Sequence, residues 1–154
     1  MTHEDDRAWM ERAITLGRKA RYWSAPNPAV GCVLLRDGVV LGEGFTQPAG
    51  SAHAEIMALQ LARDAHGPEG VAGATAFVTL EPCSHEGRTG PCVEALIEAR
   101  IKRAVVAIED PNPAISGQGV SALRDAGIAV ELGSCAEQVE QDLGGFLLRM
   151  RRGY

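Results

Sequence analysis

Three short motifs carry the side chains that are best suited to chemistry. His53 and Glu55 belong to a His-Ala-Glu triplet, Cys83 ends a Glu-Pro-Cys triplet, and Cys92 follows Pro91. One imidazole and two thiolates are good ligands for Zn²⁺, and three protein ligands leave the fourth tetrahedral position for water. Bound zinc lowers the pKa of that water towards about 7. The pattern therefore predicts a hydrolytic zinc site; the alternatives are a structural zinc site and unligated core thiols.

Glu55 is the candidate proton carrier of this site. Expelling ammonia requires a group that takes a proton from water and delivers it to a ring nitrogen and the leaving amine. The alternative is that Glu55 only stabilises a first helical turn. It lies one residue too far from Ser51 for a capping box, which would need the acid at Ala54. Zinc deaminases that act on nucleobases typically carry His-x-Glu followed by Pro-Cys-x-x-Cys. This chain departs from the second half, because eight residues, 84–91, separate Cys83 from Cys92.

The elements that must position these motifs alternate between helix and strand. Apolar spacing predicts helices over 5–22, 52–65, 91–99, 120–126 and about 135–150, and strands over 29–35, 39–45, 74–80, 103–108 and 128–131. Asp37-Gly38 predicts a tight turn between the first two strands, and Gly50-Ser51 is the expected entrance to the second helix. We expect one domain over residues 1–154, a three-layer α/β/α sandwich around a mixed sheet of about five strands.

Composition narrows the class of function. The 154 residues carry a net charge of −5, which disfavours general binding to nucleic acid. No apolar run is long enough to span a membrane and the N-terminus does not resemble a signal peptide, so we expect a cytoplasmic protein. Its four cysteines are then expected as thiols or metal ligands. Cys32 is expected as a small buried hydrophobe, and neither it nor Cys135 is proposed as a ligand.

Longer stretches around the motifs resemble one family. They are Pro-Asn-Pro-Ala-Val-Gly-Cys-Val at 26–33, Ala-Gly-Ser-Ala-His-Ala-Glu at 49–55, the segment 78–92 with eight residues between its cysteines, and Asp-Pro-Asn-Pro at 110–113. The sequence is similar, over essentially its whole length, to the diaminohydroxyphosphoribosylaminopyrimidine deaminase domain of bacterial riboflavin biosynthesis, in the cytidine-deaminase-like superfamily.

The resemblance implies an activity and a set of substrate contacts. The activity would be hydrolysis of the 2-amino group of 2,5-diamino-6-ribosylamino-4(3H)-pyrimidinone 5′-phosphate, yielding the uracil analogue and ammonia. Asn27 would hydrogen-bond the pyrimidine, and His85 and Arg88 would face the ribose phosphate, for which a guanidinium is well suited. Thr46 stands where the family usually has a histidine that contributes to the substrate pocket, so the contact there is open.

The family usually continues into an NADPH-dependent reductase domain, whereas this chain ends where that domain would begin. We therefore expect a deaminase domain without a fused reductase: a stand-alone enzyme beside a separate reductase, a truncated form of a longer protein, or a paralogue acting on a related pyrimidine or pteridine-like product. Deamination of another base, a nucleoside or tRNA, and a non-catalytic zinc-binding module, are the other hypotheses. The sequence leaves a homo-oligomer open.

Overall fold

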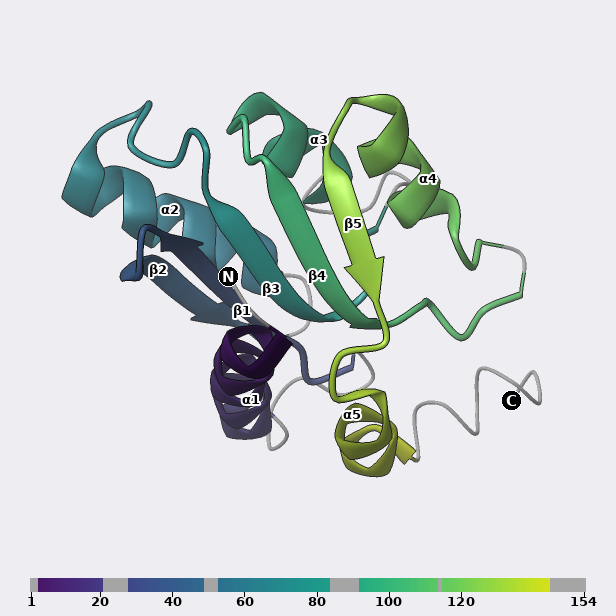
Figure 1. The fold of residues 1–154 in the computed structure, drawn as a ribbon. Helices are drawn as coiled ribbons and strands as arrows, with labels where there is room; N and C mark the ends of the chain where they lie inside the picture. Colours follow the sequence, from purple (N-terminus) through teal and green to yellow (C-terminus); the bar gives the residue numbers. More distant parts are fainter. Residues whose placement is uncertain (1–2, 21–27, 49–52, 84–91, 114, 145–154) are drawn as a thin grey trace.

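A five-stranded mixed sheet runs through the centre of the computed structural model, which describes residues 3–20, 28–48, 53–83, 92–113 and 115–144 (Figure 1). Its strands are β1 (Gly31–Arg36), β2 (Val39–Phe45), β3 (Thr75–Leu80), β4 (Arg103–Ile108) and β5 (Ala129–Leu132). Their order is β2-β1-β3-β4-β5. β1 is antiparallel to both of its neighbours, and β3, β4 and β5 are parallel. The expected mixed sheet is confirmed.

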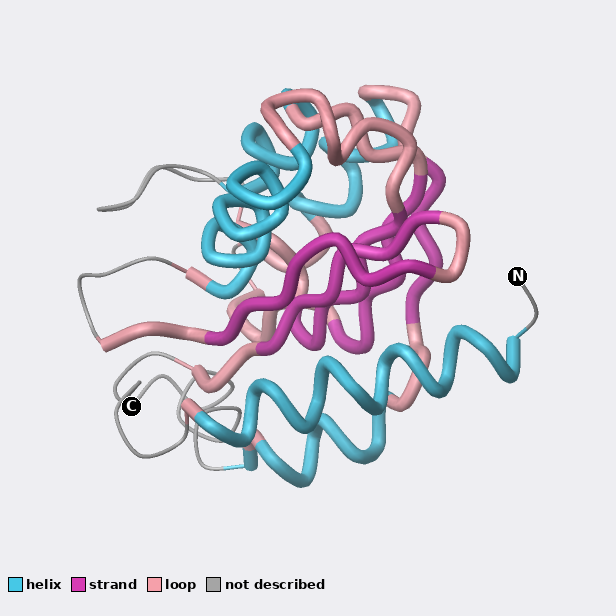
Figure 2. The backbone as a smooth tube through the Cα atoms, turned by 90° about the vertical axis from the view of Figure 1, so that its left-hand side faces the viewer, coloured by secondary structure: helices cyan, strands magenta, loops and turns pink. Residues whose placement is uncertain are grey.

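Helices cover both faces of the sheet. They are α1 (His3–Lys19), α2 (Ala54–His66), α3 (Cys92–Glu98), α4 (Gln118–Asp125) and α5 (Ala136–Asp142). Figures 1 and 2 show α1 and α5 on one face and α2, α3 and α4 on the other, which confirms the three layers. Strands that are buried on both faces read as continuous apolar runs, and every residue of β3 is buried. None of the helices described is both long and apolar enough to cross a bilayer.

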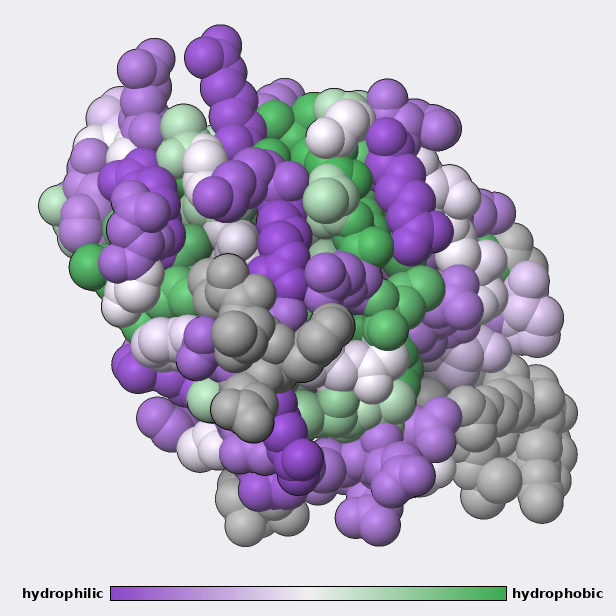
Figure 3. Space-filling view, in the orientation of Figure 1, coloured by the Kyte–Doolittle hydropathy of each residue, from purple (hydrophilic) through white to green (hydrophobic). Residues whose placement is uncertain are grey.

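The hydrophobic core lies between the sheet and its two helical layers. Met10 and Ile14 of α1 pack into it from one side, and Ala58 and Leu59 of α2 pack into it from the other. On the face drawn in Figure 3, hydrophilic side chains alternate with smaller hydrophobic areas over the described residues. Because the large apolar side chains are mostly inside, the fold supplies a rigid frame for polar groups at its edges.

The predicted elements can be compared with the structure at the turn between β1 and β2 and at the bounds of α2 and α5. Asp37 and Gly38 have φ values of 53° and 79°, so the tight turn between β1 and β2 is confirmed with left-handed backbone at both positions. α2 starts two residues later than expected, because His53 and not Ser51 occupies its N-cap position. α5 ends at Asp142, and the part of the predicted last helix over 145–150 lies outside the described residues.

Four chain segments meet at one edge of the sheet. Because β1 runs antiparallel to β3, the start of β1 lies beside the end of β3, with Cys32 paired to Val78. The end of β2 lies at the same edge, since Gly31 pairs with Phe45. β4 is parallel to β3 and ends there too. Residues just before β1 and just after β2, β3 and β4 are thereby brought together, and ligands commonly bind at such carboxyl edges.

Candidate functional site

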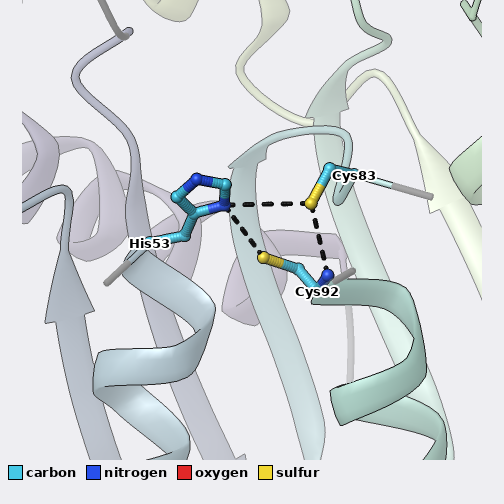
Figure 4. Close-up of side chains that lie close together, drawn as sticks. All are labelled: His53, Cys83 and Cys92. Carbon is cyan, nitrogen blue, oxygen red and sulfur yellow. Dashed lines mark hydrogen bonds between the residues drawn. The ribbon is translucent and has the colours of Figure 1, made fainter. Parts of the chain in front are cut away.

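His53, Cys83 and Cys92 converge although three different segments supply them (Figure 4). His53 is the N-cap residue of α2, Cys83 follows β3, and Cys92 opens α3. His53 Nδ1 lies 3.2 Å from Cys92 Sγ and 3.8 Å from Cys83 Sγ. The Cys92 backbone N–H donates a hydrogen bond of 3.2 Å to Cys83 Sγ. The three ligand atoms all lie within 4.8 Å of one another, as the sequence predicted.

This donor set fits a zinc ion. Ligand atoms held about 2.0–2.3 Å from a tetrahedral ion lie about 3.4–3.8 Å apart, close to the two distances measured from His53 Nδ1. Figure 4 also shows that Nδ1, and not Nε2, is the ring nitrogen that faces both sulfur atoms. Three ligands of this kind leave one position of the tetrahedron for a water or a substrate atom. The arrangement is therefore suited to an open metal site.

The thiol pKa values of Cys83 and Cys92 are shifted in opposite directions. Hydrogen bonds from the Cys92 thiol, the His53 ring and the Cys92 backbone lower the pKa of Cys83 to about 4, with the Cys92 thiol as the largest cause. The same hydrogen bond with Cys83, together with burial, raises the pKa of Cys92. Contact with Cys83 raises the pKa of His53. A thiolate at Cys83 is thus prepared for a metal, whereas Cys92 would give up its proton on binding.

A cavity opens beside these ligands. Its volume is about 160 Å³, and it is lined by Pro28, Val30, Thr46, His53, Ala54, Glu55, Leu80, Glu81, Cys83 and Asp110. Pockets for drug-sized ligands span about 300–1,000 Å³, so the described part of this cavity suits a single ring. A larger open cleft, of about 800 Å³, lies along the β5–α5 connection and shares no lining residue with it.

Glu55 lies in the first turn of α2 and lines the same cavity. Its side chain is buried, with the residue 4% exposed. Burial is the largest influence on the carboxyl and raises its pKa to about 7. A glutamate that only stabilises a helix N-terminus can remain exposed, because its favourable interaction with the helix dipole also operates at the protein surface. The position of Glu55 beside His53 and Cys83 therefore requires an explanation other than helix stability.

Thr46 lies in the cavity wall, and its hydroxyl group is hydrogen-bonded to the backbone of the segment before β1. Its Oγ1 accepts a hydrogen bond of 2.9 Å from the Val30 N–H and donates one of 3.0 Å to the Pro28 carbonyl. The Thr46 N–H in turn donates to the Val30 carbonyl. The residue is thus part of the connection that holds the segment before β1 against the segment after β2.

Glu81 has a position that its sequence motif did not reveal. It is 5% exposed and lines the cavity, and its carboxylate accepts hydrogen bonds from the backbone N–H groups of Asp110, Gly117 and Val120. In the sequence it only stands between a buried strand and Cys83. A charged residue directly after six buried strand residues was the one available signal that its side chain has buried partners.

The remaining candidates separate into two groups. Asn27, His85 and Arg88 lie outside the described residues. Cys32 is fully buried in β1, and burial raises the pKa of its thiol, as expected for a cysteine that acts as a small hydrophobe. Cys135 is partly exposed at the N-cap of α5 and does not belong to the described metal-ligand group.

The chain matches a known protein family over most of its length and individual proteins over almost all of it. Residues 3–108 match the family described as the cytidine and deoxycytidylate deaminase zinc-binding region. The riboflavin biosynthesis protein RibD of Escherichia coli is 48% identical over 149 residues, which is 97% of this chain and 39% of that protein. The diaminohydroxyphosphoribosylamino-pyrimidine deaminase of Buchnera aphidicola from Acyrthosiphon pisum is 44% identical over 150 residues and is covered to 99%.

A solved structure has the same fold. RibD of Acinetobacter baumannii superimposes with a TM-score of 0.92 at 47% sequence identity, covering 98% of this chain and 41% of that one. The chain thus spans about two fifths of the length of these RibD proteins, whereas it matches the Buchnera deaminase along almost its full length.

Proposed function

The chain belongs to the cytidine and deoxycytidylate deaminase family and, within it, to the diaminohydroxyphosphoribosylaminopyrimidine deaminases, and on this premise we propose its reaction. The substrate is 2,5-diamino-6-ribosylamino-4(3H)-pyrimidinone 5′-phosphate of riboflavin biosynthesis. Water adds to the ring carbon that carries the 2-amino group, the C–N bond breaks, and ammonia leaves. The product is 5-amino-6-ribosylaminouracil 5′-phosphate.

One observation carries this proposal: two members of a His-Cys-Cys group, His53 and Cys83, line one small cavity together with the buried Glu55. His53, Cys83 and Cys92 would hold zinc. When bound, zinc supplies Lewis-acid activation of water near neutral pH. Val30 and Leu80 contribute apolar walls to the cavity.

Glu55 is the proton carrier in this proposal. Its carboxylate accepts a proton from the attacking water and delivers it to the ring nitrogen and the leaving amine. Burial beside His53 and Cys83 supports this role, because the carboxyl is then within the same enclosed space as the reacting atoms.

Substrate contacts follow from the family resemblance. We propose that Asn27 hydrogen-bonds the pyrimidine and that His85 and Arg88 face the phosphate. Thr46 would contact the substrate through its place in the cavity wall. The size of the described cavity supports a ring-sized subsite, with the ribose phosphate outside it.

The assignment also implies partners and a setting. A phosphorylated pyrimidine is the small-molecule partner, and a reductase activity consumes the product. We propose that the reaction takes place in the cytoplasm and without nucleic acid.

Ammonia release tests the proposal directly. Zinc-replete protein is incubated with the phosphoribosyl pyrimidine, its dephosphorylated form, cytosine, guanine, their nucleosides and tRNA. We expect ammonia from the phosphoribosyl pyrimidine and little from the others. Release only from a cytosine, guanine or tRNA substrate would favour a deaminase with another specificity. Release from none, by protein with full zinc content, would favour a zinc-stabilised binding module.

A further inference from the structure

Glu81 connects two parts of the molecule that are far apart in sequence. Its own N–H donates to the Ile108 carbonyl at 2.9 Å, which extends the pairing of β3 with β4 beyond the strand ends. Its side chain turns towards the segment that follows β4. The residue stands two positions before Cys83 and lines the cavity together with Cys83 and Asp110.

Three backbone N–H groups donate to the Glu81 carboxylate. Oε1 accepts from Asp110 at 2.9 Å and from Gly117 at 3.0 Å, and Oε2 accepts from Val120 at 2.8 Å. Gly117 is the N-cap residue of α4 and, as a glycine, provides no capping side chain of its own. Val120 lies in the first turn of α4, where N–H groups have no partner within the helix. Glu81 therefore caps α4 from another element and ties Asp110 to the same carboxylate.

The start of α4 packs tightly against the Glu81-Pro82 backbone. A Cβ atom added to Gly119 would lie 2.2 Å from the Pro82 carbonyl oxygen and 3.1 Å from Glu81 Cγ. The start of α4 is thus in direct contact with the Glu81-Pro82-Cys83 segment. Asp110 is held in addition by a turn in which its Oδ1 accepts the Asn112 N–H at 2.9 Å.

We propose that Glu81 is a positioning residue for the deaminase site. Its carboxylate sets the distance between the Cys83 turn and the Asp110 wall of the cavity by bonding both Asp110 and the start of α4. The inference rests on the proposed function for its kinetic consequence, but the coupling itself is independent of the substrate. Buried carboxylates with several backbone donors are strongly held, because each lost bond leaves an unsatisfied group.

The Glu81→Gln variant tests this role in the zinc-loaded enzyme. A glutamine amide replaces one acceptor oxygen by a donor group, so at least one of the three N–H groups loses its partner. We expect faster hydrogen exchange at the Asp110, Gly117 and Val120 amides and unchanged zinc content. KM for the phosphoribosyl pyrimidine should rise roughly tenfold with a smaller change in kcat, because a displaced Asp110 wall would bind the ring less tightly while the zinc ligands stay in place. Glu98→Gln, an exposed glutamate on α3, is the matched control.

A second variant changes the contact between α4 and the Glu81-Pro82 segment at its α4 side. Gly119→Ala should separate α4 from Pro82 and reproduce the rise in KM and the faster amide exchange. Gly144→Ala should not, because an added Cβ there meets no atom of the described residues within 4 Å. Unchanged exchange at the three amides, or an unchanged KM in both zinc-loaded variants, would overturn the proposal. A loss of activity that simply follows loss of zinc would overturn it too. If the unmodified protein releases no ammonia, the proposed function fails, and amide exchange alone decides the role of Glu81.

Discussion

The carboxyl group of Glu55 is buried in the wall of the site. Glutamate is almost never fully buried without a purpose or a partner, because removing its charge from water is unfavourable. Here burial raises its pKa to about 7, and the residue lines the cavity that His53 and Cys83 also line. Perturbed carboxyl groups in enclosed sites are typical of proton-transfer residues. Replacing the Glu55 carboxyl group by an amide separates the effect of proton transfer from the effect of side-chain shape.

Glu55→Gln keeps the volume of the side chain but removes its ability to take up a proton. We expect kcat to fall by about 10²–10⁴-fold, the usual contribution of general acid–base catalysis, while zinc content stays unchanged. Ammonia release and metal analysis on the same preparation measure both quantities. Turnover at the unmodified rate would refute the proton-carrier role.

Thr46 contributes at the same scale through its hydroxyl. Thr46→Val preserves the shape of the side chain but removes the acceptor for the buried Val30 N–H and the donor to Pro28. The free energy of unfolding should fall by about 1–3 kcal/mol, the cost of leaving a buried polar group unsatisfied. Urea denaturation measures the change. Thr15→Val is the control, because that exposed hydroxyl bonds only within its own helix in the described contacts; equal losses in both variants would contradict the argument.

At the scale of elements, the position of α2 on β2 places both His53 and Glu55. Gly44 permits this close approach, since an added Cβ would lie 2.2 Å from the Ala54 carbonyl oxygen. The first turn of α2 can therefore press against the sheet and carry Glu55 into the interior. A larger residue at position 44 has to push that turn outwards.

Gly44→Ala should lower the free energy of unfolding by about 1–3 kcal/mol, as overpacking does, and should weaken zinc binding because His53 moves with α2. Thermal unfolding and a zinc titration measure the two effects. Gly144→Ala provides the comparison, because the added Cβ has no neighbour within 4 Å in the part of the chain that the structure describes. An unchanged zinc affinity in the Gly44 variant would show that α2 does not set the position of His53.

An ion pair joins α1 to the edge strand. Arg12 donates to both carboxylate oxygens of Glu43, and this hydrogen bonding lowers the pKa of Glu43. A lowered pKa means that the pair stabilises the fold above the ordinary carboxyl range and loses that effect as the pH falls. Glu43→Gln should therefore destabilise the protein at pH 7 by at most about 1 kcal/mol, because the pair is largely exposed.

The difference between Glu43→Gln and the unmodified protein should be smaller at about pH 3 than at pH 7, because the contribution of the pair is lost progressively as the pH falls from the usual carboxyl pKa of about 4.3 towards the lowered pKa of Glu43. Urea denaturation of both proteins at the two pH values measures it. A difference that persists undiminished in acid would mean that packing, and not the charge of Glu43, accounts for the effect.

At the scale of the whole molecule, the hydrophobic core and the proposed metal ligands lie in different places. Fully buried side chains such as Leu34, Phe77 and Val105 hold the layers together between the sheet and its helices, whereas His53, Cys83 and Cys92 lie at its edge. The core therefore has no need of a metal to bury its apolar surface, and a bound zinc ion would tie together the starts of α2 and α3.

Removal of zinc by a chelator should abolish ammonia release and lower the melting temperature, while the far-UV circular dichroism keeps its folded shape. The loss of stability follows because a ligand that binds only the folded state stabilises it. Added zinc should restore both properties. Complete unfolding on chelation would instead indicate a structural zinc and would support the non-catalytic module.

Local patterns determined a large part of this protein. The types and spacing of His53, Cys83 and Cys92 predicted the metal-ligand group, and alternating apolar segments predicted five strands and five helices close to their observed bounds. Asp37-Gly38 predicted the turn between β1 and β2. These properties depend on residue chemistry and on periodicity along the chain, which the linear order of residues contains directly.

The tertiary structure alone decided which distant groups share the cavity. Thr46 meets Val30 because β1 and β2 are antiparallel, and Glu81 meets Asp110 because β3 and β4 are parallel neighbours. The choice of Nδ1 as the nitrogen that faces both sulfur atoms likewise depends on how α2 lies against α3. Strand order, strand direction and helix placement result from packing of the whole core, so no local pattern could have specified these contacts.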